Sequence, residues 1–274
     1  MSEPSRKATT VPLLSVDDLS VGFEMYSRGF QRELIYSVRH LSLSVDRGEV
    51  LGIAGESGSG KSLLAHAILG LLPYNAVQTG QVLLDDTVLT PGMTTDTRSR
   101  LALVPQSVTY LDPLMAVGRQ LVEGPGTTPP SAAELAQIAR RFSLSRGDLD
   151  KIPSELSGGM IRRILLATAM LSKADLIVAD EPTPGIPVDM AKDLLADLRD
   201  LATQGCGVIV ISHDVDLIAQ IADRIAILRD GELVTALDAA AFADPDAHDN
   251  HPYAEALWRA LPDNDFASTA QDAS

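Results

Sequence analysis

Hydrophobic and polar positions follow two patterns along the chain, and each pattern predicts a different kind of strand. Between residues 13 and 23 the apolar side chains fall mostly at alternate positions, and residues 41–45 alternate strictly. Such alternation is typical of a strand that buries only one face. Later segments are continuously apolar, as expected of parallel strands that are covered on both faces. These buried runs occupy residues 50–54, 101–104, 176–179, 208–211 and 225–228.

Longer stretches between the buried runs predict helices. The stretch 63–72 follows the first buried run and is apolar nearly throughout. Further helical patterns lie at about 113–123, 131–142 and 188–203, and a Gly- and Pro-rich break occupies 124–130. Strands that alternate with helices in this way indicate an α/β core with a mostly parallel sheet.

Shorter signals complete the predicted secondary structure. Residues 24–36 predict a connection or a long hairpin, and residues 81–84 predict a further strand. Asp230-Gly231 separates the last buried run from residues 232–237, and this dipeptide is a strong signal for a two-residue β-hairpin turn.

A phosphate-binding loop is predicted between the first buried run and the helix that follows it. It fits the pattern G-x-x-x-x-G-K-[ST] with Gly55, Glu56, Ser57, Gly58, Ser59, Gly60, Lys61 and Ser62. The glycines allow successive backbone N–H groups to face inward at a helix N-terminus and form an anion cradle. Lys61 would reach the β- and γ-phosphates, and the Ser62 hydroxyl would bind Mg²⁺. The loop therefore predicts binding of a nucleoside triphosphate.

Two carboxylates follow a buried strand about 120 residues after this loop. The apolar run 176–179 leads directly into Asp180 and Glu181. Ligands of such folds lie beyond the carboxyl ends of the parallel strands, so both acids would face the phosphates. Asp180 could belong to the Mg²⁺ shell, and Glu181 could polarise a water for attack on the γ-phosphate.

A second glycine-rich helix start lies between these two motifs. Ser157, Gly158 and Gly159 precede an apolar helical stretch at 164–171. Such a helix start can also bind an anion. Because one nucleotide does not need two cradles, we expect the second cradle to serve a nucleotide held by another subunit. The pattern thus predicts a dimer with nucleotide at its interface.

Composition narrows the classes of partner. The chain has 22 basic and 37 acidic residues, a net charge of −15, which argues against nucleic acid as a partner. A single cysteine excludes a disulfide framework and a cysteine-ligated iron–sulfur cluster. Neither a secretion signal nor an apolar run of membrane-spanning length occurs in the sequence. We therefore expect a cytosolic protein whose connection to a membrane comes through a partner.

Together these motifs resemble those of the ABC-transporter ATPases. The run Leu156-Ser157-Gly158-Gly159, placed between a P-loop and the Asp180-Glu181 strand, is similar to the signature of that family. Gln106 and His213 look like its Q-loop glutamine and its switch histidine. Phe23 looks like the aromatic residue that stacks on adenine, with Tyr36 as the alternative.

The resemblance covers about residues 13–262 and implies a specific organisation. It implies a P-loop NTPase of the α/β class, with a RecA-like core, an antiparallel β-lobe and an inserted helical lobe at about 107–170. The cofactors would be ATP and Mg²⁺. Gln106 would sense Mg²⁺ and a membrane subunit, and His213 would hold the γ-phosphate. The implied division is a disordered N-terminus (1–12), an ATPase domain (13–237) and an acidic C-terminal extension (238–274).

A sub-family is also indicated. The run 153–160 is similar to that of peptide and nickel importers, and so is the spacing from Gln106 to 111–113. The segment 251–257 looks like the His-Pro-Tyr element near the end of those ATPases. Met160 departs from the family, where many members have Gln.

The importer resemblance implies a subunit that binds and hydrolyses ATP and powers the import of peptides, nickel or metal chelates. It also implies partners. These are a second ABC ATPase subunit, two membrane-spanning permease subunits and, indirectly, an extracytoplasmic substrate-binding protein. The chain would then lie on the cytoplasmic face of the cell membrane. Pro187 stands where the family usually has the D-loop aspartate. This substitution favours pairing with a different ATPase chain, although Pro187 also suits the first turn of a helix.

Two other functions stay open at this point. One is a soluble accessory ATPase of an enzyme complex, as in the phosphonate-cleaving lyase, whose ATPases are similar in sequence. The other is a regulatory nucleotide-binding subunit that hydrolyses ATP poorly, which Pro187 favours and which Glu181 and His213 oppose.

Overall fold

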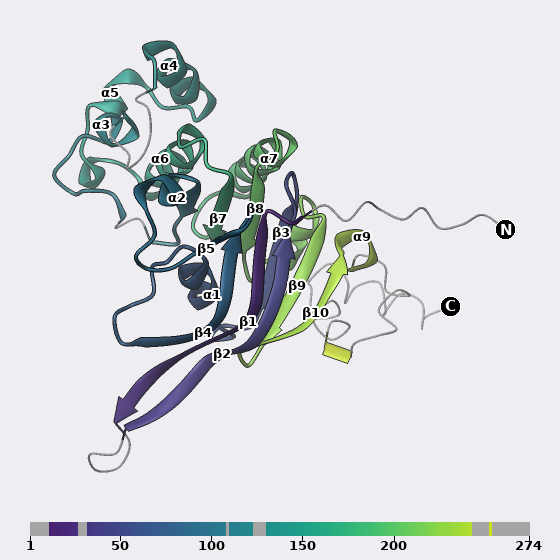
Figure 1. The fold of residues 1–274 in the computed structure, drawn as a ribbon. Coiled ribbons are helices and arrows are strands. Elements are labelled where there is room, and N and C mark those ends of the chain that lie inside the picture. The colour runs from purple at the N-terminus through teal and green to yellow at the C-terminus, as the bar shows by residue number, and fades with distance from the viewer. Residues whose placement is uncertain (1–10, 27–31, 108–109, 123–129, 243–251, 254–274) are drawn as a thin grey trace, which may run out of the picture.

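The computed structural model describes residues 11–26, 32–107, 110–122, 130–242 and 252–253 of the 274-residue chain. Within this part, a four-stranded and a six-stranded β-sheet form the centre, and a group of helices stands to one side (Figure 1). The predicted α/β fold with an additional antiparallel β-lobe is therefore confirmed.

The six-stranded sheet contains the predicted buried runs. Its strands are β3 (Val50–Gly55), β6 (Leu101–Val104), β7 (Leu176–Asp180), β8 (Gly207–Ile211), β9 (Arg224–Arg229) and β10 (Glu232–Asp238). Their spatial order is β10-β9-β3-β8-β7-β6. Neighbours pair in parallel from β9 to β6, whereas β10 pairs with β9 antiparallel. Asp230 and Gly231 join β9 to β10 with φ angles of 51° and 83°, as the two-residue turn requires.

The four-stranded sheet is antiparallel and has the order β2-β1-β4-β5. Its strands are β1 (Leu14–Tyr26), β2 (Arg32–Val45), β4 (Ala76–Leu84) and β5 (Thr87–Val88). The hairpin of β1 and β2 projects far beyond the rest of the sheet (Figure 1). Both strands extend past the predicted segments 13–23 and 41–45. Cross-strand backbone hydrogen bonds extend the ladder through positions where apolar alternation is lost.

Helices connect these strands and also form the group beside the sheets. They are α1 (Lys61–Ile68), α2 (Thr95–Ser99), α3 (Val117–Val122), α4 (Ala132–Arg141), α5 (Arg146–Leu149), α6 (Gly158–Leu171), α7 (Val188–Thr203), α8 (Val215–Ala219) and α9 (Ala239–Phe242). Helix α1 ends before the predicted residue 72. Gly70 has a φ of 64°, and the Leu71 N–H donates to the His66 carbonyl at 2.8 Å, which closes the helix with a Schellman turn.

Side chains of the parallel strands alternate between two hydrophobic layers, as the period of two in a strand requires. Leu51 and Ile209 belong to the layer that also contains residues of the antiparallel sheet and of α1. Val208 and Ile177 belong to the opposite layer, which contains residues of α6 and α7. The parallel sheet is thus covered on both faces, and this explains why its strands are continuously apolar.

The predicted helix at 113–123 is shorter in the structure. Helix α3 begins only at Val117, because the preceding segment is held as a loop. The Asp112 carboxylate accepts from the Leu114 N–H at 2.8 Å. The Gln120 side chain also bonds both the N–H and the carbonyl of Asp112, at 2.8 and 3.0 Å. These side-chain bonds satisfy the backbone outside a helix.

Some predictions lie partly or wholly outside the described residues. They concern most of the N-terminal segment 1–12, the break at 124–130 and most of the acidic extension 238–274. The division into domains stays a prediction. Over the described ranges, none of the helices combines the length and the apolar character needed to cross a bilayer.

Candidate functional site

The P-loop connects the end of β3 to the start of α1, and its backbone requires glycine. Gly58 and Gly60 have φ angles of 84° and 99°. A Cβ atom on Gly55 would lie 2.2 Å from the Leu228 carbonyl oxygen, and one on Gly60 would lie 2.9 Å from the Ser37 carbonyl oxygen. The loop therefore packs directly against neighbouring backbone, and larger residues at Gly55 and Gly60 would displace it.

Lys61 is buried at the N-terminus of α1. Its Nζ donates hydrogen bonds to the carbonyl oxygens of Gly55 at 2.7 Å and Glu56 at 2.8 Å, and it lies 3.5 Å from the Ser59 hydroxyl. Burial lowers the pKa of Lys61, and the nearby charges of Glu181 and Asp180 oppose that shift. The ammonium thus lies inside the loop.

Ser62 and Asp180 lie together although 118 residues separate them in sequence. The Ser62 hydroxyl donates to Oδ1 of Asp180 at 3.3 Å. Burial raises the pKa of Asp180, and the Ser62 hydrogen bond opposes this rise. A hydroxyl and a carboxylate oxygen are the hard ligands that Mg²⁺ prefers, so this pair fits the predicted metal site.

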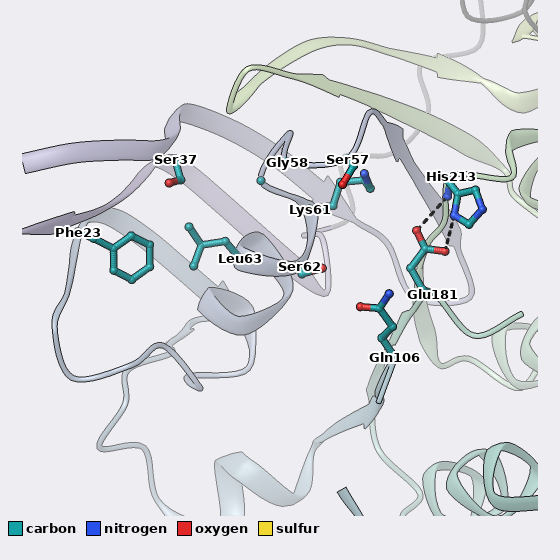
Figure 2. Close-up of a pocket in the computed structure, with 11 residues that line it drawn as sticks. Phe23, Ser37, Ser57, Gly58, Lys61, Ser62, Leu63, Gln106, Glu181 and His213 are labelled. Atoms are coloured by element: carbon teal, nitrogen blue, oxygen red, sulfur yellow. Dashed lines mark hydrogen bonds and ion pairs between the residues drawn. The ribbon is translucent and has the colours of Figure 1, made fainter. Parts of the chain in front are cut away.

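Glu181 and His213 form a pair at the carboxyl ends of β7 and β8. Glu181 Oε2 lies 2.9 Å from His213 Nδ1, and Glu181 Oε1 accepts from the His213 backbone N–H at 3.1 Å (Figure 2). The Ser212 hydroxyl donates to the same carboxylate at 3.4 Å. Glu181 has a φ of 48°, which is rare for a residue other than glycine and turns the chain sharply after β7. These contacts fix the orientation of a largely buried carboxylate.

A single cavity of about 490 Å³ brings most of these groups together. It is lined by Phe23, Ser37, Ser57, Gly58, Gly60, Lys61, Ser62, Leu63, Gln106, Glu181 and His213. Phe23, Ser37 and Leu63 lie at one end, and Glu181, His213 and Gln106 lie at the other (Figure 2). The cavity thus has an apolar end, a basic loop and an acidic end in that order.

The structure separates the two aromatic candidates. Phe23 pairs with Ile35 across the hairpin, and Tyr36 pairs with Gly22. Because directly opposed residues share a face of the sheet, Phe23 and Tyr36 point to opposite faces. Phe23 lines the cavity and Tyr36 is absent from its lining.

Ser157, Gly158 and Gly159 lie away from this cavity, at the start of α6. The Ser157 hydroxyl accepts from the Met160 N–H at 3.3 Å and caps the helix. A Cβ atom on Gly158 would meet no atom of the described residues within 4 Å, and Ser157 and Gly158 are exposed. Within one chain, the two predicted cradles therefore do not share a site.

Pro187 occupies the N-cap position of α7, one residue before the predicted helical turn. Its φ and ψ are −58° and 147°, and its carbonyl accepts from the Ala191 N–H at 2.9 Å. The helix begins at Val188. The prediction that Pro187 lies at a helix start is therefore correct. The expectation that it belongs to the first helical turn is wrong by one residue, because its ψ is extended.

Sequence reasoning missed two residues of the cavity, Ser37 and Leu63. Leu63 directly follows the P-loop motif, so its place in the first turn of α1 is a signal that could have been used. Ser37 is recognisable only once the register of the β1–β2 hairpin is known.

Known proteins resemble this chain over nearly its whole length. Residues 38–184 match the family model for the ABC transporter. An oligopeptide transport ATP-binding protein of Lactococcus lactis is 33% identical, over 93% of this chain and 78% of that protein. A dipeptide transport ATP-binding protein of Escherichia coli is 35% identical, over 92% of this chain and 79% of that protein.

Solved structures agree on the fold. A dimeric ATP-binding cassette in a post-hydrolysis state with ADP and Pi superposes with a TM-score of 0.71 and 24% sequence identity. The superposition covers 82% of this chain and 98% of that cassette. The P-loop, the paired carboxylates and the matched sequence therefore lead to one conclusion: the chain belongs to the ABC transporter family.

Proposed function

We propose that the chain is the ATP-binding and hydrolysing subunit of an ABC importer of peptides. The observation that carries this proposal is the cavity in which Lys61, Ser62, Glu181 and His213 meet at the carboxyl edge of the parallel sheet. The substrate class rests on the relatives, which are named as oligopeptide and dipeptide transport proteins.

The order of groups along the cavity supports one orientation of ATP. Adenine would stack on Phe23 at the apolar end, and the triphosphate would lie on the P-loop. Lys61 would exchange its two carbonyl partners for phosphate oxygens, which are charged and therefore stronger acceptors.

The acidic end of the cavity supports hydrolysis. Ser62, Asp180 and Gln106 would hold Mg²⁺, which neutralises charge on the phosphate oxygens when it is bound. Glu181 would accept the proton of the attacking water, because its carboxylate is fixed beside the cavity. His213 lines the cavity beside Glu181, and its ring would hold an oxygen of the γ-phosphate.

The open helix start at Ser157-Gly158-Gly159 supports assembly with a second ATPase. It is exposed on the chain's own surface and would complete a nucleotide site only on a partner. Pro187 lacks a carboxylate and cannot replace the aspartate expected at the interface. This difference favours a different ATPase chain as partner.

Two permease subunits and, indirectly, an extracytoplasmic binding protein would complete the importer at the cytoplasmic face of the membrane. Exposed apolar side chains that follow Gln106 in sequence support a permease contact. Leu114 and Tyr110 are 88% and 54% exposed, and both follow Gln106 closely in sequence.

Fractionation tests the proposed assembly. A tagged full-length chain, expressed in the cells that encode it, should appear in the membrane fraction. Mass spectrometry of the purified complex should find two permeases and a second ABC ATPase. Recovery in the soluble fraction with subunits of a metabolic enzyme would contradict the importer and support the accessory ATPase instead.

Substitution of Phe23 tests the orientation of the nucleotide. Phe23→Leu should weaken ATP binding by about tenfold, because stacking of a base on an aromatic ring contributes about 1–3 kcal/mol. Tyr36→Leu is the matched control and should leave affinity unchanged, because Tyr36 faces the other side of the hairpin. Competition against a fluorescent ATP analogue measures both, and equal affinities in the two variants would count against stacking on Phe23.

A further inference from the structure

A tyrosine near the end of the chain contacts the P-loop. Tyr253 belongs to the His-Pro-Tyr element, which the proposed mechanism does not use. Its hydroxyl donates to Oε1 of Glu56 at 3.1 Å, across 197 residues of sequence. Glu56 is the second residue of the P-loop. Tyr253 therefore reaches the phosphate-binding loop itself.

A cation holds the tyrosine ring in place. The guanidinium carbon of Arg229 lies 4.7 Å from the centre of the Tyr253 ring, which is a cation–π contact. Arg229 ends strand β9, and its Nε lies 3.5 Å from the Asp230 carboxylate in the following turn. The ring thus packs against a side chain at the end of a sheet strand, which fixes the hydroxyl relative to the P-loop.

The turn between β9 and β10 also lies close to the P-loop. A Cβ atom built on Gly60 would lie 3.7 Å from Cα of Gly231. The Gly231 carbonyl accepts from the Arg39 N–H at 2.7 Å, which ties the turn to β2. The turn therefore lies close to Gly60, near one end of the P-loop, and Tyr253 contacts Glu56 near the other end.

Glu56 connects Tyr253 to the lysine of the P-loop. The Glu56 carbonyl accepts from Lys61 Nζ at 2.8 Å and from the Ser59 N–H at 3.2 Å. The side chain of the same residue accepts from Tyr253. A change in the position of Glu56 is therefore transmitted directly to the carbonyl that Lys61 binds.

We propose that Tyr253 is a positioning residue of the nucleotide site, which acts through Glu56 on the conformation of the P-loop and of Lys61. This inference rests on the proposed ATP-binding function and extends it to the C-terminal segment. Tyr253 is not among the residues that line the cavity, so it would act on the site through its hydrogen bond to Glu56 and not by contact with the nucleotide. That bond would fix the position of the Glu56 carboxylate.

The protonation state of Tyr253 supports this role. Burial and the hydrogen bond to Glu56 raise the pKa of Tyr253 above its ordinary value. At neutral pH the hydroxyl is therefore protonated and can donate. A second negative charge beside the Glu56 carboxylate would be unfavourable.

Tyr253→Phe is the sharpest test, because it removes the hydroxyl and leaves the ring over Arg229. In the full-length chain, ATP affinity should fall by roughly three- to tenfold, the size expected for loss of one ordinary hydrogen bond. Tyr74→Phe, at a fully exposed tyrosine, is the matched control and should bind as the unmodified chain does. Titration with a fluorescent ATP analogue, with Mg²⁺ present, measures all three proteins.

Glu56 variants test whether the Tyr253 hydroxyl acts through Glu56. The effect of Tyr253→Phe should disappear in the E56A background, because the acceptor is gone, and should persist in the E56Q background, whose side-chain oxygen still accepts. If the hydroxyl instead acted through a partner other than Glu56, the effect of Tyr253→Phe would be the same in all three backgrounds. The melting temperature without nucleotide should not change between Tyr253→Phe and the unmodified chain.

The outcomes distinguish this inference from the proposed function. Unchanged or tighter ATP binding by Tyr253→Phe, or an undiminished effect in the E56A background, overturns the role of Tyr253 while ATP binding stands. Failure of the unmodified chain to bind ATP would overturn the proposed function, and the role of Tyr253 with it.

Discussion

Lys61→Ala should abolish ATP hydrolysis and weaken ATP binding by roughly ten- to a hundredfold. The expected loss follows from the removal of charge-assisted hydrogen bonds, each of which contributes about 1.5–3 kcal/mol. Lys61 is buried within the loop, and the hydrogen-bond partners of its Nζ among the described residues are two backbone carbonyls and a hydroxyl. A phosphate group would accept stronger hydrogen bonds from Lys61 than these neutral groups do, and alanine has no donor for it.

The folded state should survive this substitution. Burial lowers the pKa of Lys61, which means that the charged form is disfavoured in the loop before nucleotide binds. We therefore expect the melting temperature of the nucleotide-free variant to stay close to that of the unmodified chain. Lys192→Ala, on the exposed face of α7, is the matched control. Turnover near the normal rate in Lys61→Ala would contradict the assignment of the P-loop.

Glu181→Gln should separate binding from chemistry. Glutamine keeps an oxygen that can accept from the His213 backbone N–H, so the shape of the cavity and the affinity for ATP should be retained. It cannot accept a proton from water, and hydrolysis should fall by about 10²- to 10⁴-fold. Because ATP then stays intact between two subunits, the closed dimer should accumulate.

Size-exclusion chromatography with ATP and Mg²⁺, together with phosphate release, measures both effects. Glu232→Gln, at an exposed glutamate of β10, is the control and should behave as the unmodified chain. If Glu181→Gln hydrolyses ATP normally, Glu181 is not the base. If hydrolysis stops but no longer-lived dimer or complex forms, the expected assembly around ATP is wrong.

The sequence predicted a structural element well wherever one continuous segment contains the whole element. The strand, loop and helix around Lys61 are contiguous, so their order alone predicts an anion cradle. The buried runs of the parallel sheet were recognisable for a similar reason, because burial on both faces demands apolar residues at every position. The Asp230-Gly231 turn followed from the positive φ that both residues must adopt.

Segments whose structure depends on distant partners were predicted less well. The β1–β2 ladder continues to the pair Tyr26 and Arg32, because each strand supplies hydrogen bonds to the other regardless of hydrophobicity. The short helices α2 and α5 lack the length for a periodic signal. Each begins at a hydroxyl cap, Thr94 and Ser145, of the kind that also occurs in loops.

The sequence by itself thus determined the chemistry of this protein: a phosphate-binding loop, two carboxylates after a buried strand and a family signature. Only the tertiary structure decided which groups meet. Strand order brought Ser62 to Asp180 and Glu181 to His213, and the hairpin register placed Phe23, not Tyr36, on the face that lines the cavity. The contact between Tyr253 and Glu56 could likewise not be predicted from the sequence. A motif records residues that are adjacent along the chain, whereas these contacts depend on how strands far apart in sequence pair and pack.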